Sequence, residues 1–267
     1  MPVGYSIYTD APSALHQKID PRTKLIGLMA IFVLALEFNH PMVLALLLAG
    51  VLGLGAWAQL PFKRFVPFLL GASWFVLIGV LIWPIYIQQG RPLFAVHGVQ
   101  VTLDGILFGL AMGLRVALMV VTAGLWMMTT SPQRITLGLL KMGLPYRAGL
   151  AMATTIRFIP LINAERTMVI EAQRARGLRL DRRNPLARAK SSVAIVGPLA
   201  LRSLDLVQSL AAAMDARGVG ARQARTSLVE LRMTRADIAI IAICGIAVFA
   251  GLVMRILGVG VLVKGYL

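Results

Sequence analysis

Residues 106–130, ILFGLAMGLRVALMVVTAGLWMMTT, decide the fold, because Arg115 is the only charged residue in this stretch. A helix needs about 20 apolar residues to cross the hydrocarbon core of a bilayer, so the stretch predicts a transmembrane helix. The whole chain has the same character, since 58% of its 267 residues are apolar and only 14% are charged. Soluble domains have about a quarter of their residues charged. The composition predicts an integral membrane protein and excludes disordered and collagen-like chains, and a single cysteine, Cys244, excludes a disulfide scaffold.

Four more apolar stretches are candidate spans, the first of them short: residues 25–38, 41–60, 66–88 and 238–257. Basic residues near the span ends gather on one face, for example Lys63 and Arg64 between the second and third spans. By the positive-inside rule that face is cytoplasmic. We therefore expect an all-α, multi-pass protein of the cytoplasmic (inner) membrane with about five transmembrane helices. Its N-terminus and residues 131–235 are expected in the cytoplasm.

The segment between the fourth and fifth spans carries most of the positive charge. Residues 132–235 hold 18 Lys and Arg residues and six Asp and Glu residues, in a chain with a net charge of +16. A short helix over 132–142 is expected first. Apolar residues then recur at three- and four-residue steps in two parts of the segment, which predicts two long amphipathic helices. Pro160 and Pro198 lie inside these helices, where a missing amide and a crowded ring predict kinks.

The expected organisation has three parts: a membrane region over 1–130, a cytoplasmic region of coupling helices over 131–235, and a C-terminal span within 236–267.

The two long helices are expected to end in the same triplet, Ala-Arg-Gly, at Ala175-Arg176-Gly177 and at Ala216-Arg217-Gly218. A helix C-terminus carries partial negative charge, so an arginine there is stabilised where it stands and still offers a planar set of donors to an acidic partner. Glycine can take the left-handed conformation that closes a helix. Each triplet alone could be an ordinary basic helix end, but two copies favour a docking role.

The chain closely resembles the transmembrane T component of energy-coupling factor (ECF) transporters, which import vitamins and transition-metal ions. The resemblance covers nearly the whole chain. It rests on LHQKIDPRTKL at 15–25, TTSP at 129–132, RFIP at 157–160 and the two Ala-Arg-Gly triplets. The second triplet lies in a typical context, AMDARG at 213–218, with Asp215 where the family often has glutamate.

The resemblance implies a division of labour among subunits. Two cytoplasmic ATPase subunits would use ATP and magnesium, a small membrane S component would bind the substrate, and this chain would join them while binding no cofactor itself. Arg176 and Arg217 correspond to the family's motif arginines, which dock in grooves of the two ATPases. The long helices would be coupling helices that carry motion to the S component, and the cargo cannot be inferred from this chain.

The residues themselves predict no catalytic site and no metal site. A Gly-x-x-x-x-Gly-Lys-Ser/Thr phosphate-binding loop is absent from the sequence. His16, His40 and His97 are far apart in the chain and are expected near different membrane faces, which argues against a shared metal ion. The absence of aromatic residues among the arginines after residue 178 argues against nucleic acid as a partner. The glycines at 50, 53 and 55 are interpreted as sites of close helix packing.

Arg115 lies well inside the fourth span, where a charged residue is by default a functional candidate. Glu37 is its expected partner, in a possible intramembrane pair. The alternative is that Arg115 extends to the external headgroups while Glu37 lies at the same surface.

Two other function classes stay open on sequence alone. A stand-alone secondary carrier or channel would use Arg115 to line a solute path, and it would work without an ATPase. A membrane-anchored basic scaffold would bind acidic lipids or proteins in a salt-sensitive manner.

Overall fold

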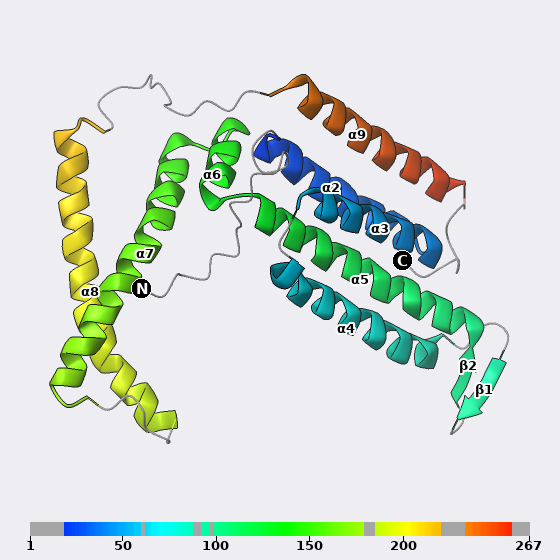
Figure 1. The fold of residues 1–267 in the computed structure, drawn as a ribbon, viewed down its shortest axis with the longest axis horizontal. Helices are drawn as coiled ribbons and strands as arrows, with labels where there is room; N and C mark the ends of the chain where they lie inside the picture. The colour runs from blue at the N-terminus through cyan, green and yellow to red at the C-terminus, as the bar shows by residue number, and fades with distance from the viewer. Residues whose placement is uncertain are drawn as a thin grey trace. The chain divides into compact units, whose positions relative to one another are not determined.

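The computed structural model describes residues 19–59, 62–87, 92–96, 99–178, 185–219 and 233–257, and most of them are helical. The helices are α2 (Pro21–Glu37), α3 (Pro41–Trp57), α4 (Phe62–Tyr86), α5 (Leu103–Thr129), α6 (Pro132–Lys141), α7 (Tyr146–Ala175), α8 (Pro185–Ala216) and α9 (Arg235–Ile256). Figure 1 shows these elements along the chain. The expected all-α multi-pass class is confirmed.

The helices fall into two compact units, which are described separately. The larger unit contains α2 to α6 and α9, and the smaller unit contains α7 and α8. The division of the chain falls at Pro145 and Leu231. The short helix α6, which we expected to group with the coupling helices, belongs to the larger unit, because it packs on α2.

Helix α5 is the centre of the larger unit, since it packs against α2, α3 and α4. Phe108, Leu118, Val121 and Met128 on this helix are completely buried. They form the core together with residues of the neighbouring helices such as Leu44 of α3. The stretch that decided the class of the protein is therefore also the stretch around which its membrane helices assemble.

Glycines let α4 and α5 approach closely along their length, where Figure 1 draws them side by side. A Cβ atom at Gly79 would lie 2.6 Å from the carbonyl oxygen of Gly109, and one at Gly113 would lie 2.6 Å from the Cα of Val76. Small residues at such contacts allow backbones to pack closely in membranes.

The glycines that we expected to pack closely lie elsewhere, in α3, and the expectation was largely wrong. Gly50 and Gly53 have no atom within 4 Å of a built Cβ, and only Gly55 meets neighbours, the nearest on Leu125. The sequence of α3 alone did not reveal which of its faces meets another helix.

Helix lengths agree with most of the expected spans. Within α4, residues Phe65–Tyr86 are long and apolar enough to cross a membrane, and so are α5 and α9 over their full lengths. The helix α3 is a shorter apolar helix of 17 residues, and α2 has the same length. Part of α8, Ser192–Ala216, also has the length and composition of a span, although we expected it in the cytoplasm.

An antiparallel hairpin, which the sequence analysis did not predict, connects α4 to α5. Its strands are β1 (Pro92–Val96) and β2 (Val99–Thr102). The buried Thr102 closes the connection, because its hydroxyl donates to the carbonyl of Ile87 over 3.1 Å and accepts from the amide of Gly105 over 3.2 Å. Thr102 is thereby also the N-cap of α5.

Candidate functional site

The two Ala-Arg-Gly triplets adopt the same backbone structure. Helix α7 ends at Ala175 and Arg176 is its C-cap, while Gly177 has a left-handed φ of 86°. The amide of Gly177 donates to the carbonyl of Arg174 over 2.9 Å, and the amide of Leu178 donates to that of Gln173 over 3.0 Å. These two bonds define a Schellman motif, which satisfies carbonyls that a helix end would otherwise leave free.

The end of α8 repeats this motif bond for bond. Gly218 has a φ of 64°, its amide donates to the carbonyl of Asp215 over 2.9 Å, and the amide of Val219 donates to that of Met214 over 2.9 Å. The backbone amide of Arg217 donates to the carbonyl of Ala213 over 3.2 Å, as the corresponding amide of Arg176 does to that of Ala172. The repeated triplet in the sequence is therefore a repeated structure.

All six residues of the triplets are exposed: Ala175, Arg176, Gly177, Ala216, Arg217 and Gly218. Alanine and glycine leave each guanidinium without a bulky neighbour beside it in the chain, so a partner surface can approach the arginine closely. Because the Schellman bonds use backbone groups only, the arginine side chains remain available as donors. Docking of these residues to an ATPase stays a prediction.

The two prolines expected to kink the long helices lie inside them, Pro160 in α7 and Pro198 in α8. Figure 1 shows that α8 changes direction along its length. A proline inside a helix removes one hydrogen bond and bends the axis. The kinks themselves remain an expectation for α7.

Helices α7 and α8 contact each other but bury few of their side chains. Of the apolar side chains described in this unit, only that of Val169 is buried. Large apolar residues stay exposed on both helices, among them Ile159, Met168, Val196 and Leu201, which are 52 to 66% exposed. Large apolar side chains that stay exposed among the described residues are typical of surfaces that another protein or lipid covers.

The predicted pairing of Glu37 with Arg115 does not occur. Arg115 is buried, and its guanidinium donates to the carbonyl of Ala35 over 2.9 Å, to that of Phe38 over 3.0 Å and to the side chain of Asn39. All three acceptors lie at the C-terminal end of α2, where helix carbonyls have no partner within the helix. The alternative expectation, extension of Arg115 to the external headgroups, stays a prediction.

Glu37 faces a different helix. Its side chain is buried and lies against Gly251 of α9, where a Cβ atom would collide with its Oε2 atom. Among the described residues, this Oε2 atom has no hydrogen-bond partner. A spacing argument could not have shown this, because α2 and α9 are far apart in the chain.

The motif around residues 20–25 forms a junction at the start of α2. Asp20 caps this helix by accepting from the amide of Arg22 over 3.0 Å, and its own amide donates to the buried carboxylate of Asp237 over 3.0 Å. Asp237 also completes a capping box with Thr234 at the start of α9. The starts of α2 and α9 are thus joined by buried polar contacts.

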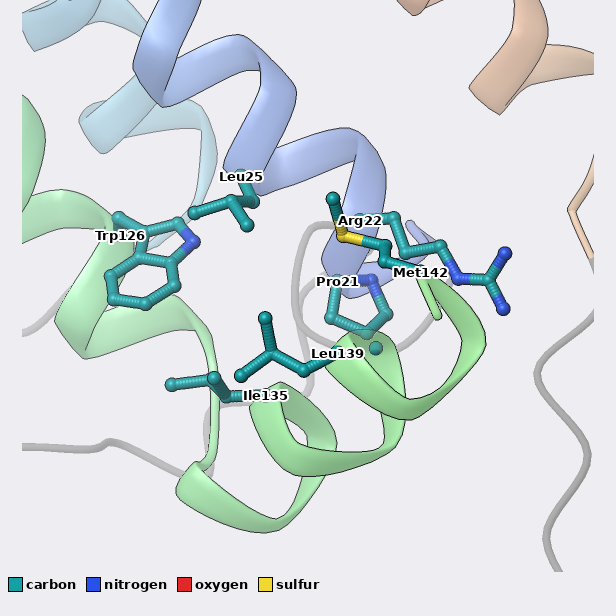
Figure 2. Close-up of a pocket in the computed structure, with 8 residues that line it drawn as sticks. Pro21, Arg22, Leu25, Trp126, Ile135, Leu139 and Met142 are labelled. Carbon is teal, nitrogen blue, oxygen red and sulfur yellow. The ribbon is translucent and has the colours of Figure 1, made fainter. Parts of the chain in front are cut away.

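The same junction holds α5 and α6. The ammonium of Lys24 donates to the carbonyl of Thr129, at the last residue of α5, over 2.8 Å. Figure 2 shows Leu25 next to Trp126, with Ile135 and Leu139 of α6 close to them. The cavity that they surround measures about 10 Å³, enough for one water molecule at most.

Sequence reasoning used this motif only as a mark of resemblance and missed its structural role. The signal was present in Asp20-Pro21, an N-cap residue followed by proline at the first helical position. The partners Thr129 and Asp237 could not be inferred, because they are distant in the chain.

Within the described parts of the chain, no three His, Cys, Asp or Glu side chains lie close enough to hold a metal ion. His40 serves as the N-cap of α3, where its Nδ1 atom accepts from the amide of Met42 over 3.3 Å. His16 and His97 lie outside the described residues.

Comparison with known proteins agrees with this geometry. The model of the family CbiQ, cobalt transport protein, matches residues 12–228. The chain belongs to this family. It is 31% identical to the energy-coupling factor transporter transmembrane protein EcfT of Listeria innocua, over 92% of this chain and 94% of that protein.

Other relatives carry the same name. The EcfT proteins of Acidaminococcus fermentans and Bacillus subtilis are each 29% identical to this chain, and the matches cover 86% and 88% of it. They cover 88% and 91% of the relatives. The resemblance to T components is therefore confirmed, and this member of the CbiQ family is a multi-pass transmembrane component of an energy-coupling factor transporter.

Proposed function

We propose that this chain couples ATP hydrolysis in two cytoplasmic ATPase subunits to movement of a membrane S component that binds a vitamin or a transition-metal ion. The chain itself carries out no catalysis and holds no cofactor; ATP and magnesium are bound by the ATPases. Its partners are those two subunits, which are identical or related to each other, the S component and the lipid bilayer.

One observation carries the proposal: two exposed arginines stand at two helix ends with the same backbone structure. Two equivalent tips suit two equivalent partners, because each ATPase of a pair would receive the same arginine in the same frame. Arginine binds carboxylates through two parallel hydrogen bonds, which gives such a contact direction as well as strength. ATP-driven movement of the ATPases would then displace α7 and α8 together.

The exposed apolar surfaces of α7 and α8 support the second half of the proposal. An S component that lies in the membrane would present apolar side chains, and Val193, Val196 and Val207 on one face of α8 offer it a complementary surface. Part of α8 is apolar enough to lie at membrane depth.

The test is co-purification of the ATPases with the tagged chain from cells that express the whole transporter. Arg176→Glu combined with Arg217→Glu should release the ATPases, because each tip would present an anion where the proposed partner groove accepts a cation. Arg157→Glu combined with Arg166→Glu is the matched control, since these arginines are exposed on α7 outside the triplets. If the ATPases remain bound to the double tip variant at the control level, the proposal is wrong.

A further inference from the structure

The place where α7 and α8 face each other is charged, unlike the exposed apolar surfaces around it. The α7 side is formed by Glu165, Val169 and Arg176, at spacings of four and seven residues. The α8 side is formed by Leu201, Arg202 and Asp205, at spacings of one and three residues. Together with neighbouring side chains they line a cleft of about 330 Å³. The spacings place the three α7 residues on one helix face, and Leu201 and Asp205, four residues apart, share a face of α8.

Glu165 of α7 forms an ion pair with Arg202 of α8 in this cleft. Its carboxylate Oε2 atom lies 3.9 Å from a guanidinium nitrogen of Arg202, and its side chain is 14% exposed. Among the described residues this buried oxygen has no hydrogen-bond partner, so Arg202 supplies its compensating charge. A carboxylate removed from water needs such a charge, whereas Arg202, with a side chain that is 64% exposed, stays solvated.

The location of this ion pair decides what it can do. It lies next to Val169, the buried apolar side chain at the contact of the two helices. Arg176 lines the same cleft, while Arg217 lies further along α8. Two helices that contact each other over a small area can change their crossing angle while exposing little buried surface. A single charged pair at the contact therefore has a large influence on the angle and on the distance between the tips.

We propose that Glu165 and Arg202 are positioning residues that form the pivot of the two coupling helices. The inference rests on the proposed function, since it assigns the pair the task of keeping two ATPase-docked tips in a defined relation. When the pair is intact, displacement of one tip moves both helices as a unit. When it is broken, each helix follows its own ATPase and the movement that reaches the S component is lost.

The experiment measures the distance between the helix ends in the complete transporter. Cysteines replace the exposed Arg174 and Ala213, in the last turn of each helix, in a Cys244→Ser background, and both are spin-labelled. Pulsed electron resonance then gives the distance distribution with and without ATP and magnesium. We expect one narrow distribution that shifts with nucleotide, and a broad distribution without that shift for Glu165→Gln and for Arg202→Gln.

Three further arms separate the pivot from other roles. Glu171→Gln, an exposed glutamate on α7 outside the cleft, should behave like the unmodified chain. Glu165→Arg combined with Arg202→Glu should restore the narrow, shifting distribution, since the reversed pair keeps opposite charges in place. Retention of the ATPases should stay at the control level in all of these variants.

Narrow, shifting distances in both single variants would overturn the pivot, and so would failure of the reversed pair to recover. Because Arg202 is largely exposed, Arg202→Gln folds even if Glu165→Gln does not. A failure of the proposed function is seen separately, as retention of the ATPases after charge reversal of Arg176 and Arg217.

Discussion

Arg115 of α5 caps the C-terminal end of α2 and thereby connects these two helices. It lies near the middle of α5, and its buried guanidinium meets two carbonyls at the end of α2 and the amide side chain of Asn39. The helix dipole places partial negative charge at that end, so the cation is stabilised without an acidic partner. A charged residue inside a membrane helix predicted a function here, and the geometry shows a structural role.

We expect Arg115→Leu to lower the stability of the folded chain by about 3 kcal/mol, because it removes the guanidinium donor from the buried carbonyls of Ala35 and Phe38. The measurement is thermal unfolding of the purified protein in detergent. Arg115→Lys should lose less, since an ammonium still supplies donors to part of the site.

A double variant that exchanges the charges of Glu37 and Arg115 distinguishes this capping role of Arg115 from an ion pair. Exchange of the two charges, Glu37→Arg with Arg115→Glu, should unfold at least as readily as Arg115→Leu, because a carboxylate cannot donate to carbonyls. Recovery to the stability of the unmodified chain would show that the two side chains act as a pair.

At the scale of the single helix, the chain ends its elements by local rules, and these parts were predictable. Ser131-Pro132 starts α6 as expected, with the Ser131 hydroxyl accepting from the amide of Arg134. Gly177 and Gly218 end α7 and α8 where the triplets predicted. Caps and glycines depend on neighbours within four residues, so a sequence window contains their whole cause.

Gly177→Ala and Gly218→Ala should each destabilise the end of their helix by about 1 kcal/mol, because alanine is strained in the left-handed conformation. Hydrogen exchange at the amides of residues 178 and 219 measures the opening of the motif. Gly197→Ala in α8 is the control and should be neutral or stabilising, since nothing lies within 4 Å of its Cβ position. Equal exchange in the control and the end variants would contradict the prediction.

Gly113→Val should destabilise the larger unit by about 2 kcal/mol or more, because the added atoms must force α4 and α5 apart. Unfolding in detergent measures the loss. Gly71→Val, on α4 with open space at its Cβ position, should unfold close to the unmodified chain. A similar loss in both variants would mean that helix propensity, and not the close approach, sets the effect.

At the scale of the whole molecule, the pattern of charges predicts which face of the membrane each loop meets. In a Cys244→Ser background, Tyr86→Cys should react with a membrane-impermeant maleimide in intact cells. Lys63→Cys and Glu171→Cys should react only after the cells are permeabilised. All three side chains are exposed in the folded chain, so burial does not limit the labelling. Labelling of Lys63→Cys in intact cells would reverse the orientation.

The buried polar contacts that escaped prediction share one property, which is the distance between their partners along the chain. Lys24 bonds to Thr129, Asp20 to Asp237 and Arg115 to Ala35, and no window of neighbouring residues contains both members of any of these pairs. The fold class, the ends of the helices and the two repeated Ala-Arg-Gly ends follow from composition and from interactions between neighbouring residues. The partners of buried polar groups follow from the packing of helices, which a single sequence does not specify.

If the proposed function holds, the paired helix ends also determine how force would enter this subunit. In a helix whose last turn opens easily, work done on the end is absorbed in uncoiling. Here two backbone bonds lock the final turn behind each arginine. A push by a docked partner on Arg176 or Arg217 would therefore displace the whole helix, and the partner's own movement would set the length of that displacement.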